Sequence, residues 1–450
     1  MFKRPILLLL AAAVVLGGCS SPSNPTPTAV STATSATPTA SSDPVADAYT
    51  LLLQNSAEPV SPASLGAAAV KGLRSELAAE GVIPPQVAEP AFTADPNQDL
   101  VLIHDTAQVA SDRYDGKLLP DQANAAMIDS MAQSVGDCHT VYLTPSELQQ
   151  QLDFMNNSTR FGGIGAELHK VQIGDPLVIW RVFSGSPAEK AGLRSGDVIR
   201  AVDGKDVTGY TAQEAVDLIR GTIGTPVSLE ILSPGQSTPH TVVVQRGQIQ
   251  PPDVEYRMLQ NHIGYVEVYG YSQNTASDFR NALNALNSQG ATAWVIDLRD
   301  NGGGLLTSVT ASLSMFLPKD TPLYYLTDAT GKRTEYKADG SVLPHIPPVV
   351  VLTNADTASG AELFAAGLSE NGLARIVGQK TAGCVGTGQL FPLPDGSGLQ
   401  VTVDKMLTGK GKNLNRVGIT PDYPVDMTLK DLIAGRDPQL AKAIQILSGP

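Results

Sequence analysis

The sequence has 450 residues, enough for two to three domains, and its apolar content of 42% is normal for a soluble globular protein. Its formal net charge is -13 and it has no block of basic residues, which excludes nucleic acid as a partner. The histidines and cysteines form no ligand cluster at zinc spacing, so neither a metal nor another cofactor is expected.

Residues 1–18 are predicted to be a signal peptide. Lys3 and Arg4 supply the charged start, and an apolar run follows. The letters LGGC then end at Cys19, with small residues before the cysteine, which is similar to a bacterial lipobox. The alternative is an ordinary secretory signal with a chance cysteine. We expect an exported protein of the cell envelope, anchored to the membrane by lipid on Cys19 and facing outward.

Ser, Thr, Pro and Ala dominate residues 19–43, a composition that cannot bury a core and predicts a disordered tether. Residues 44–150 show helical periodicity and form a helical N-terminal region. It ends in the run GDCHTVYLTP, residues 136–145, and a short helix from Ser146. Helices are predicted in this region over residues 45–55, 62–80, 96–113 and 121–135.

Residues 160–247 change to short alternating strands with one amphipathic helix over 211–220. The runs FGGIG, SPAEKAGLRSGDVI, VDG and AQEAVDLIRG follow one another in this region. Together they resemble a PDZ domain. The resemblance implies that a peptide adds as a strand along residues 164–168, with its terminal carboxylate on the N–H groups of the glycine loop. The implied peptide-binding residues are Gly162, Gly163, Ile164 and Gly165. The alternative is that the module only packs against its neighbour.

Residues 253–427 alternate strands and helices, which predicts an α/β domain with a central sheet. Residues 428–450 close the chain as helix, interrupted at Pro438. The predicted strand at 293–298 is followed by RDNGGG, whose glycines can direct N–H groups toward one point. Further strands are predicted over 263–268, 323–326, 349–353, 390–392 and 399–403, and helices over 274–288, 305–316 and 360–372.

Ser359 follows the strand at 349–353 and a short polar turn, at the start of a helix. A serine on a sharp strand-to-helix turn can be a nucleophile while the next N–H groups face an oxyanion. On this stretch alone, a helix-capping serine with Glu362 in a capping box is the commoner explanation. Set beside the glycine run, Ser359 would attack a carbonyl, and the N–H groups of Gly360 and of Gly303 or Gly304 would hold the oxyanion.

Taken in order, the mature chain has a helical segment, DCHTVYLTP, the PDZ-like unit, IDLRDNGG, TASGAE, GQKTAG and GITPD. This order resembles the C-terminal processing peptidases, or tail-specific proteases, of serine peptidase family S41. The resemblance implies an α+β multidomain protein with an N-terminal helical segment, a PDZ domain and an α/β protease core like those of ClpP and crotonase. It also implies that Ser359 is the nucleophile of a serine endopeptidase.

One position departs from that family, which places a lysine general base where this sequence has Cys384. A neutral thiol is no base for serine, and three alternatives stay open. His139 could be the base, as in tricorn-like members, with Asn415 as an uncharged orienting residue at the acidic position. The site could be inactive or very slow, which leaves a peptide-binding scaffold. Lys380 could shift into place.

The resemblance also brings Cys138 and Cys384 to the same cleft, because Cys138 adjoins His139 and Cys384 holds the base position. In an exported protein the two can form a disulfide that ties the helical region to the catalytic loop and holds His139 or gates activity. Two buried free thiols are the alternative, since pairing needs Cα atoms within about 7 Å.

We therefore expect a lipid-anchored serine endopeptidase that cuts envelope proteins or C-terminal tails captured by the PDZ domain. Its partners would be proteins or peptides with exposed C-termini, and the membrane through the N-terminal lipid. The competing hypothesis is a catalytically impaired lipoprotein that binds tails as a scaffold. The sequence leaves the substrate, the oligomeric state and the redox state of the cysteines open.

Overall fold

The computed structural model describes residues 43–449 except 84 and 115. The predicted signal peptide, the lipidation site Cys19 and all but the last residue of the predicted tether lie outside the described residues. No helix in the described part of the chain is both long enough and apolar enough to cross a membrane.

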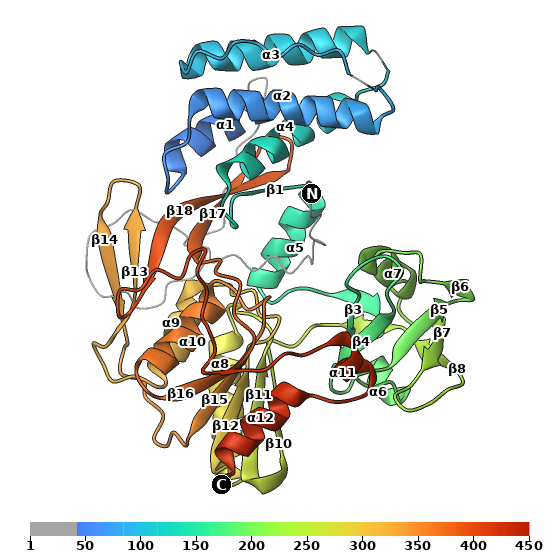
Figure 1. Ribbon diagram of the computed structural model, residues 1–450, viewed down its shortest axis with the longest axis vertical. Helices are drawn as coiled ribbons and strands as arrows, with labels where there is room; N and C mark the ends of the chain where they lie inside the picture. Colours follow the sequence, from blue (N-terminus) through green and yellow to red (C-terminus); the bar gives the residue numbers. More distant parts are fainter. Residues whose placement is uncertain (1–42, 84, 115, 450) are drawn as a thin grey trace.

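The helical N-terminal region stacks as a separate layer at one end of the molecule (Figure 1). Each of its helices begins with proline at the first turn, where the missing N–H costs nothing. Asp43, Ser61 and Asp95 cap the first three with their side chains. The helices are α1 (Pro44–Asn55), α2 (Pro62–Ala79), α3 (Pro96–Arg113) and α4 (Pro120–Val135), all within a residue of the predicted bounds.

A short strand ties this helical region to the rest of the molecule. β1 (Val141–Leu143) pairs antiparallel with β18 (Gly398–Thr408), a strand from near the end of the chain. The sheet is completed by β17 (Gly386–Pro392), β13 (Pro322–Asp328) and β14 (Arg333–Lys337). Leu399 and Val401 of β18 also belong to the core of the helical region. The segment that carries His139 is thus joined to β18 by backbone hydrogen bonds.

The PDZ-like unit lies to one side, joined through α5 (Pro145–Met155) (Figure 1). Its main sheet has β3 (Ala166–His169) at an edge, followed by β4 (Leu177–Val182). The sheet continues with β5 (Val198–Val202), β7 (Pro226–Leu232) and β8 (His240–Gln245), and β6 (Lys205–Asp206) pairs with β5. The helices are α6 (Pro187–Lys190) and α7 (Ala212–Ile219), and β2 (Phe161–Gly163) pairs with β9 (Gly247–Ile249).

The central sheet of the core has six strands in the order β10-β11-β12-β15-β16-β19, all parallel except the first pair. Alternate residues of β15 (Val349–Thr353) face opposite sides of the sheet. Val351 packs toward α8 (Thr275–Ser288), α9 (Leu306–Ser314) and α10 (Gly360–Glu370), whereas Val350 and Leu352 pack toward α12 (Pro438–Leu447). The strands are β10 (Val254–Met258), β11 (Ile263–Val268), β12 (Ala293–Asp297), β15 (Val349–Thr353), β16 (Ala374–Gly378) and β19 (Tyr423–Pro424). A 3-10 turn, η1 (Gln260–His262), precedes β11, and the helices are α8 (Thr275–Ser288), α9 (Leu306–Ser314) and α10 (Gly360–Glu370).

The chain ends in two helices rather than one, α11 (Leu429–Ile433) and α12 (Pro438–Leu447). Pro438 interrupts the predicted helix by starting α12, with Asp437 as its cap. Leu432 of α11 packs on Val178 and Trp180 of the PDZ-like unit, so the end of the chain holds that unit against the core. The predicted α+β fold class is confirmed, whereas β10, β14, β16 and β19 of the core had no predicted counterpart.

Candidate active site

Ser359 occupies the turn between β15 and α10 with φ 54° and ψ -120°. A positive φ is uncommon for serine and costs energy, so it persists only where the surroundings impose it. Ser359 is fully buried, and its Oγ has no hydrogen-bond partner among the described residues. A serine that only capped its helix would use that oxygen on the helix N–H groups, so the unpaired Oγ favours the candidate nucleophile.

The Glu362 carboxylate holds the Ser359 turn against the loop that contains Cys384. One oxygen accepts from the N–H groups of Ser359 at 3.1 Å and Cys384 at 3.0 Å. The other accepts from the Thr381 hydroxyl at 2.5 Å and the Gly383 N–H at 3.0 Å. Burial raises the pKa of Glu362, and these donors pull it back down. The sequence pattern indicated Glu362 only as a capping partner, because this second role depends on how the Cys384 loop packs against the turn.

The glycine run packs directly on the Ser359 turn. A Cβ on Gly303 would lie 2.7 Å from the Gly360 nitrogen and 2.8 Å from the Ser359 Cβ. The N–H of Gly303 donates to the Asn301 side chain at 2.9 Å, which corrects the candidate role of Gly303 as an oxyanion donor. The N–H groups of Gly304 and Gly360 have no acceptor among the described residues, so these two are the remaining candidate donors.

Cys138 and Cys384 are joined by a disulfide, with their Cα atoms 5.9 Å apart. Cys138 is exposed, Cys384 is half-buried and His139 is buried beside them. The Nδ1 of His139 lies 3.4 Å from the Cys138 sulfur, and both ring nitrogens lie 3.7 Å from the Cys384 sulfur. The position at which the family resemblance places a lysine is therefore filled by a disulfide in contact with an imidazole.

The structure does not assemble the predicted base with the candidate nucleophile. His139 makes no hydrogen bond to Ser359 in the described chain, because its ring faces the disulfide. Burial lowers the pKa of His139 to about 4, against a smaller opposing effect of Asp137. The side chain of Asn415 makes no hydrogen bond to the imidazole in the described residues, and Lys380 is exposed. No hydrogen bond among the described residues therefore supports the orienting role of Asn415.

Two groups of ligand-type side chains come together that spacing in the sequence did not reveal. Cys138, His139 and Cys384 form one, and Glu167, His169 and Asp300 form the other, each with its ligand atoms within 4.8 Å. In the first group the two sulfurs are bonded to each other and are not free thiolates. In each group one member is distant in sequence, Cys384 in the first and Asp300 in the second, so neither group shows the spacing of a zinc motif.

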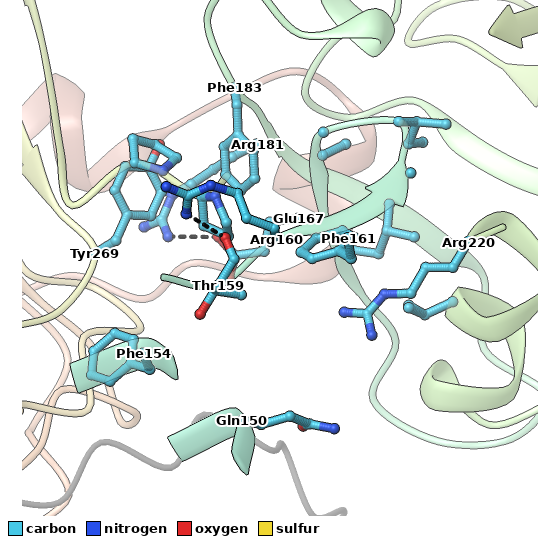
Figure 2. Close-up of a pocket in the computed structure, with 18 of the residues that line it drawn as sticks. Gln150, Phe154, Thr159, Arg160, Phe161, Glu167, Arg181, Phe183, Arg220 and Tyr269 are labelled. Carbon is cyan, nitrogen blue, oxygen red and sulfur yellow. Dashed lines mark hydrogen bonds and ion pairs between the residues drawn. The ribbon is translucent and has the colours of Figure 1, made fainter. Parts of the chain in front are cut away.

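A cavity of about 630 Å³ opens between the PDZ-like unit, α5 and the core (Figure 2). Gly163, Ile164 and Gly165 line it, together with apolar residues of α7 such as Val216 and Ile219. Gly162 does not line the cavity but packs against the backbone of Gly221. A Cβ on Gly162 would meet the Gly221 carbonyl oxygen, and the Gly221 N–H donates to the Gly162 carbonyl. Three of the four predicted peptide-binding residues therefore lie at the cavity, beside the free edge of β3.

Arg181 of β4 anchors the PDZ-like unit to the core at the inner end of this cavity. Its guanidinium pairs with Glu167 at 2.9 Å, with Asp300 at 3.4 Å and with Glu267, and it donates to the Arg299 carbonyl at 3.0 Å. Burial raises the pKa of Glu267 to about 7, against the opposing attraction of Arg181. No local sequence pattern indicates this network, since it depends on how the two units pack.

Comparison with known proteins places these features in a family. Residues 262–425 match the model of peptidase family S41, and residues 179–233 match that of the PDZ domain. The chain is 35% identical over 308 residues to the carboxyl-terminal-processing protease of Picosynechococcus sp., covering 68% of this chain and 73% of the relative. It is 32% identical over 350 residues to the carboxy-terminal processing protease CtpB of Bacillus subtilis, covering 76% and 72%. A solved structure of a photosystem II D1 C-terminal processing protease has the same fold, with a TM-score of 0.50 and 24% identity over 87% of this chain and 96% of that one.

Proposed function

Because the chain belongs to peptidase family S41 and is a serine-type peptidase, we propose that it is an exported endopeptidase that cuts envelope proteins or their C-terminal tails. The PDZ domain captures the tail, and Ser359 is the nucleophile. The observation that carries the proposal is the Ser359 turn, with its positive φ, its unpaired Oγ and the free N–H groups of Gly304 and Gly360 beside it.

The proposed reaction begins with capture of an extended tail along β3, where backbone hydrogen bonds give affinity and the cavity takes side chains. Ser359 Oγ then attacks the scissile carbonyl, and the Gly304 and Gly360 N–H groups stabilise the oxyanion. His139 takes the serine proton, for which its ring has to turn from the disulfide toward Oγ. The protonated His139 then gives that proton to the leaving amine as the peptide C–N bond breaks, and water hydrolyses the acyl-enzyme to restore Ser359.

Export and membrane attachment complete the proposal. The apolar run after Lys3 and Arg4 supports secretion, and the small residues before Cys19 support lipidation there. The peptidase would then act outside the cytoplasmic membrane on proteins within reach of the 19–43 tether. Growth in labelled palmitate tests this part: the parent chain should carry label, and Cys19→Ser should not.

The test of activity uses a reporter protein with an unstructured C-terminal tail and no cysteines, incubated with the full chain carrying Cys19→Ser, with and without dithiothreitol. Ser359→Ala should abolish cleavage, while Ser369→Ala, a serine at the end of the same helix, should leave it intact. A tail ending in an amide should be cut more slowly than one ending in a carboxylate. Cleavage that survives in Ser359→Ala would overturn the assignment of the nucleophile.

A peptide-binding scaffold is the second candidate, favoured by the absence of a hydrogen bond between His139 and Ser359 in the described residues. In that case the tail binds at the cavity and is released uncut. Equal binding of the carboxylate-ended tail by the parent and by Ser359→Ala, without cleavage under either redox condition, would favour the scaffold.

A further inference from the structure

The two ends of the Cys138–Cys384 disulfide lie in different surroundings. Cys138 is exposed to solvent, whereas Cys384 is half-buried. The Cys138 sulfur lies 3.4 Å from Nδ1 of His139, and the Cys384 sulfur lies 3.7 Å from both ring nitrogens. An external thiolate therefore reaches the Cys138 sulfur more easily, and the sulfur that leaves is that of Cys384. The exchange would release its negative charge beside the imidazole.

We propose that this disulfide is a thiol-exchange site for a dithiol reductant, and that the Cys384 thiolate it releases is the anionic partner that His139 needs to act as a base. The inference rests on the proposed peptidase function and assigns its regulation. The oxidised protein would be the resting form, and reduction would complete a Ser359–His139–Cys384 relay.

The exchange balances as an ordinary two-step reduction. One thiolate of the dithiol attacks the Cys138 sulfur, the S–S bond breaks, and its electron pair leaves with Cys384 as thiolate. The second thiol of the reductant then displaces Cys138 from the mixed disulfide. The reductant ends as a disulfide, and the protein gains two electrons, with the Cys138 thiolate taking up a proton from water.

The charge of the His139 ring depends on the groups that surround it. Besides the two cysteines, Asp137 is the one titratable group that acts on the imidazole in the described chain, and its carboxylate is already occupied by the N–H groups of His139 and Thr140. Burial holds the pKa of His139 at about 4, which makes it a weak base at neutral pH. A thiolate in contact with the ring favours the imidazolium and raises that pKa.

Reduction would leave the segment docked, because other bonds hold it. The Gln400 side chain donates to the His139 carbonyl at 2.7 Å, and the Thr402 N–H donates to the Thr140 hydroxyl at 3.1 Å. Arg416 links the His139 segment to the Cys384 loop. Its guanidinium donates to the Gly136 carbonyl, and its backbone N–H donates to the Gly383 carbonyl. The Cys384 N–H stays on Glu362. The switch is thus a change of charge rather than a release of the loop.

The test compares variants of the full chain carrying Cys19→Ser, so that Cys138 and Cys384 are its only cysteines. Dithiothreitol should raise kcat/KM on the cysteine-free reporter about a hundredfold, a size typical of general base catalysis. Cys138→Ser should be active without reductant, and Cys384→Ser should stay slow with or without it. Both lack the disulfide and keep one cysteine beside His139, so they differ in which sulfur remains: the half-buried one of Cys384 or that of the exposed Cys138. Equal activity of these two variants, or of the oxidised and reduced parent, would overturn the switch.

A third variant separates failure of the switch from failure of the peptidase. Cys138→Ser with Cys384→Lys restores the lysine of the family and should cut the reporter regardless of reductant. If it cuts and the parent ignores dithiothreitol, only the switch is wrong; if no variant cuts, both proposals fall. NMR titration of the His139 ring gives a readout without turnover: its pKa should be higher in Cys138→Ser than in the oxidised parent, and an unchanged pKa would refute the charge argument.

Discussion

Glu362→Gln removes one acceptor oxygen from the carboxylate that joins the Ser359 turn to the Cys384 loop. The least costly orientation puts the amide NH₂ toward Thr381, whose hydroxyl can turn to accept, and leaves the buried Gly383 N–H without a partner. An unsatisfied buried N–H costs about 1–3 kcal/mol, so the free energy of unfolding should fall by that amount. The opposite orientation would strand the N–H groups of Ser359 and Cys384 and cost more.

Guanidinium denaturation and reporter cleavage measure the two consequences. Cleavage should fall by at least tenfold, because the loop that positions His139 and the nucleophile loses its common anchor. Glu370→Gln is the matched control on the same helix: Glu370 pairs with the exposed Lys412 at 3.2 Å, and such pairs contribute less than about 1 kcal/mol. If Glu362→Gln unfolds and cuts like the parent, the carboxylate does not hold the site together.

Three further predictions concern the glycine run, a buried ion pair and pH. Gly303→Ala should abolish cleavage, because its Cβ would meet the Gly360 nitrogen at 2.7 Å. Gly331→Ala, also at positive φ but in open space, should retain cleavage, and equal cleavage rates of the two variants would refute the packing argument. Arg299→Met should lower the free energy of unfolding by about 3–5 kcal/mol in denaturant titrations by stranding the buried Asp297 carboxylate, and a loss below about 1 kcal/mol would contradict this. The pKa of His139 is about 4 in the folded chain and 6.5 in the unfolded chain, so between these pH values the unfolded state binds one more proton. The free energy of unfolding of the oxidised chain should therefore fall by up to about 3 kcal/mol as the pH drops from 6.5 to 4. His139→Gln should flatten that part of the stability curve, and an unchanged curve would count against the buried neutral imidazole.

The helices and the Ser359 turn could be predicted because local rules decide them. Proline at the first turn and an acidic or hydroxyl cap fixed the starts of α2 and α3. The apolar run of β15 ended at a polar turn, which placed Ser359 at the start of α10. The strand β19 shows no strand pattern in the sequence, since it is only two residues long and forms by pairing with β16 in the folded sheet.

The rest depended on packing that no local pattern encodes. Arg181 meets Glu267 and Asp300 only because the PDZ domain docks on the core. Gly303 lost its predicted role as a donor because the side chain of Asn301, two residues earlier, takes its N–H. The family resemblance brought His139 to the cleft, but only the structure shows its ring against a disulfide.

The central claim, that Ser359 is the nucleophile of a serine peptidase, is tested most directly by covalent labelling. The full chain carrying Cys19→Ser would be incubated with a fluorophosphonate, oxidised and reduced, and the labelled peptide identified by mass spectrometry. We predict a single adduct on Ser359 that forms faster after reduction and is lost in Ser359→Ala. An adduct on another residue, or none in either redox state while the folded chain still binds tails, would contradict the account.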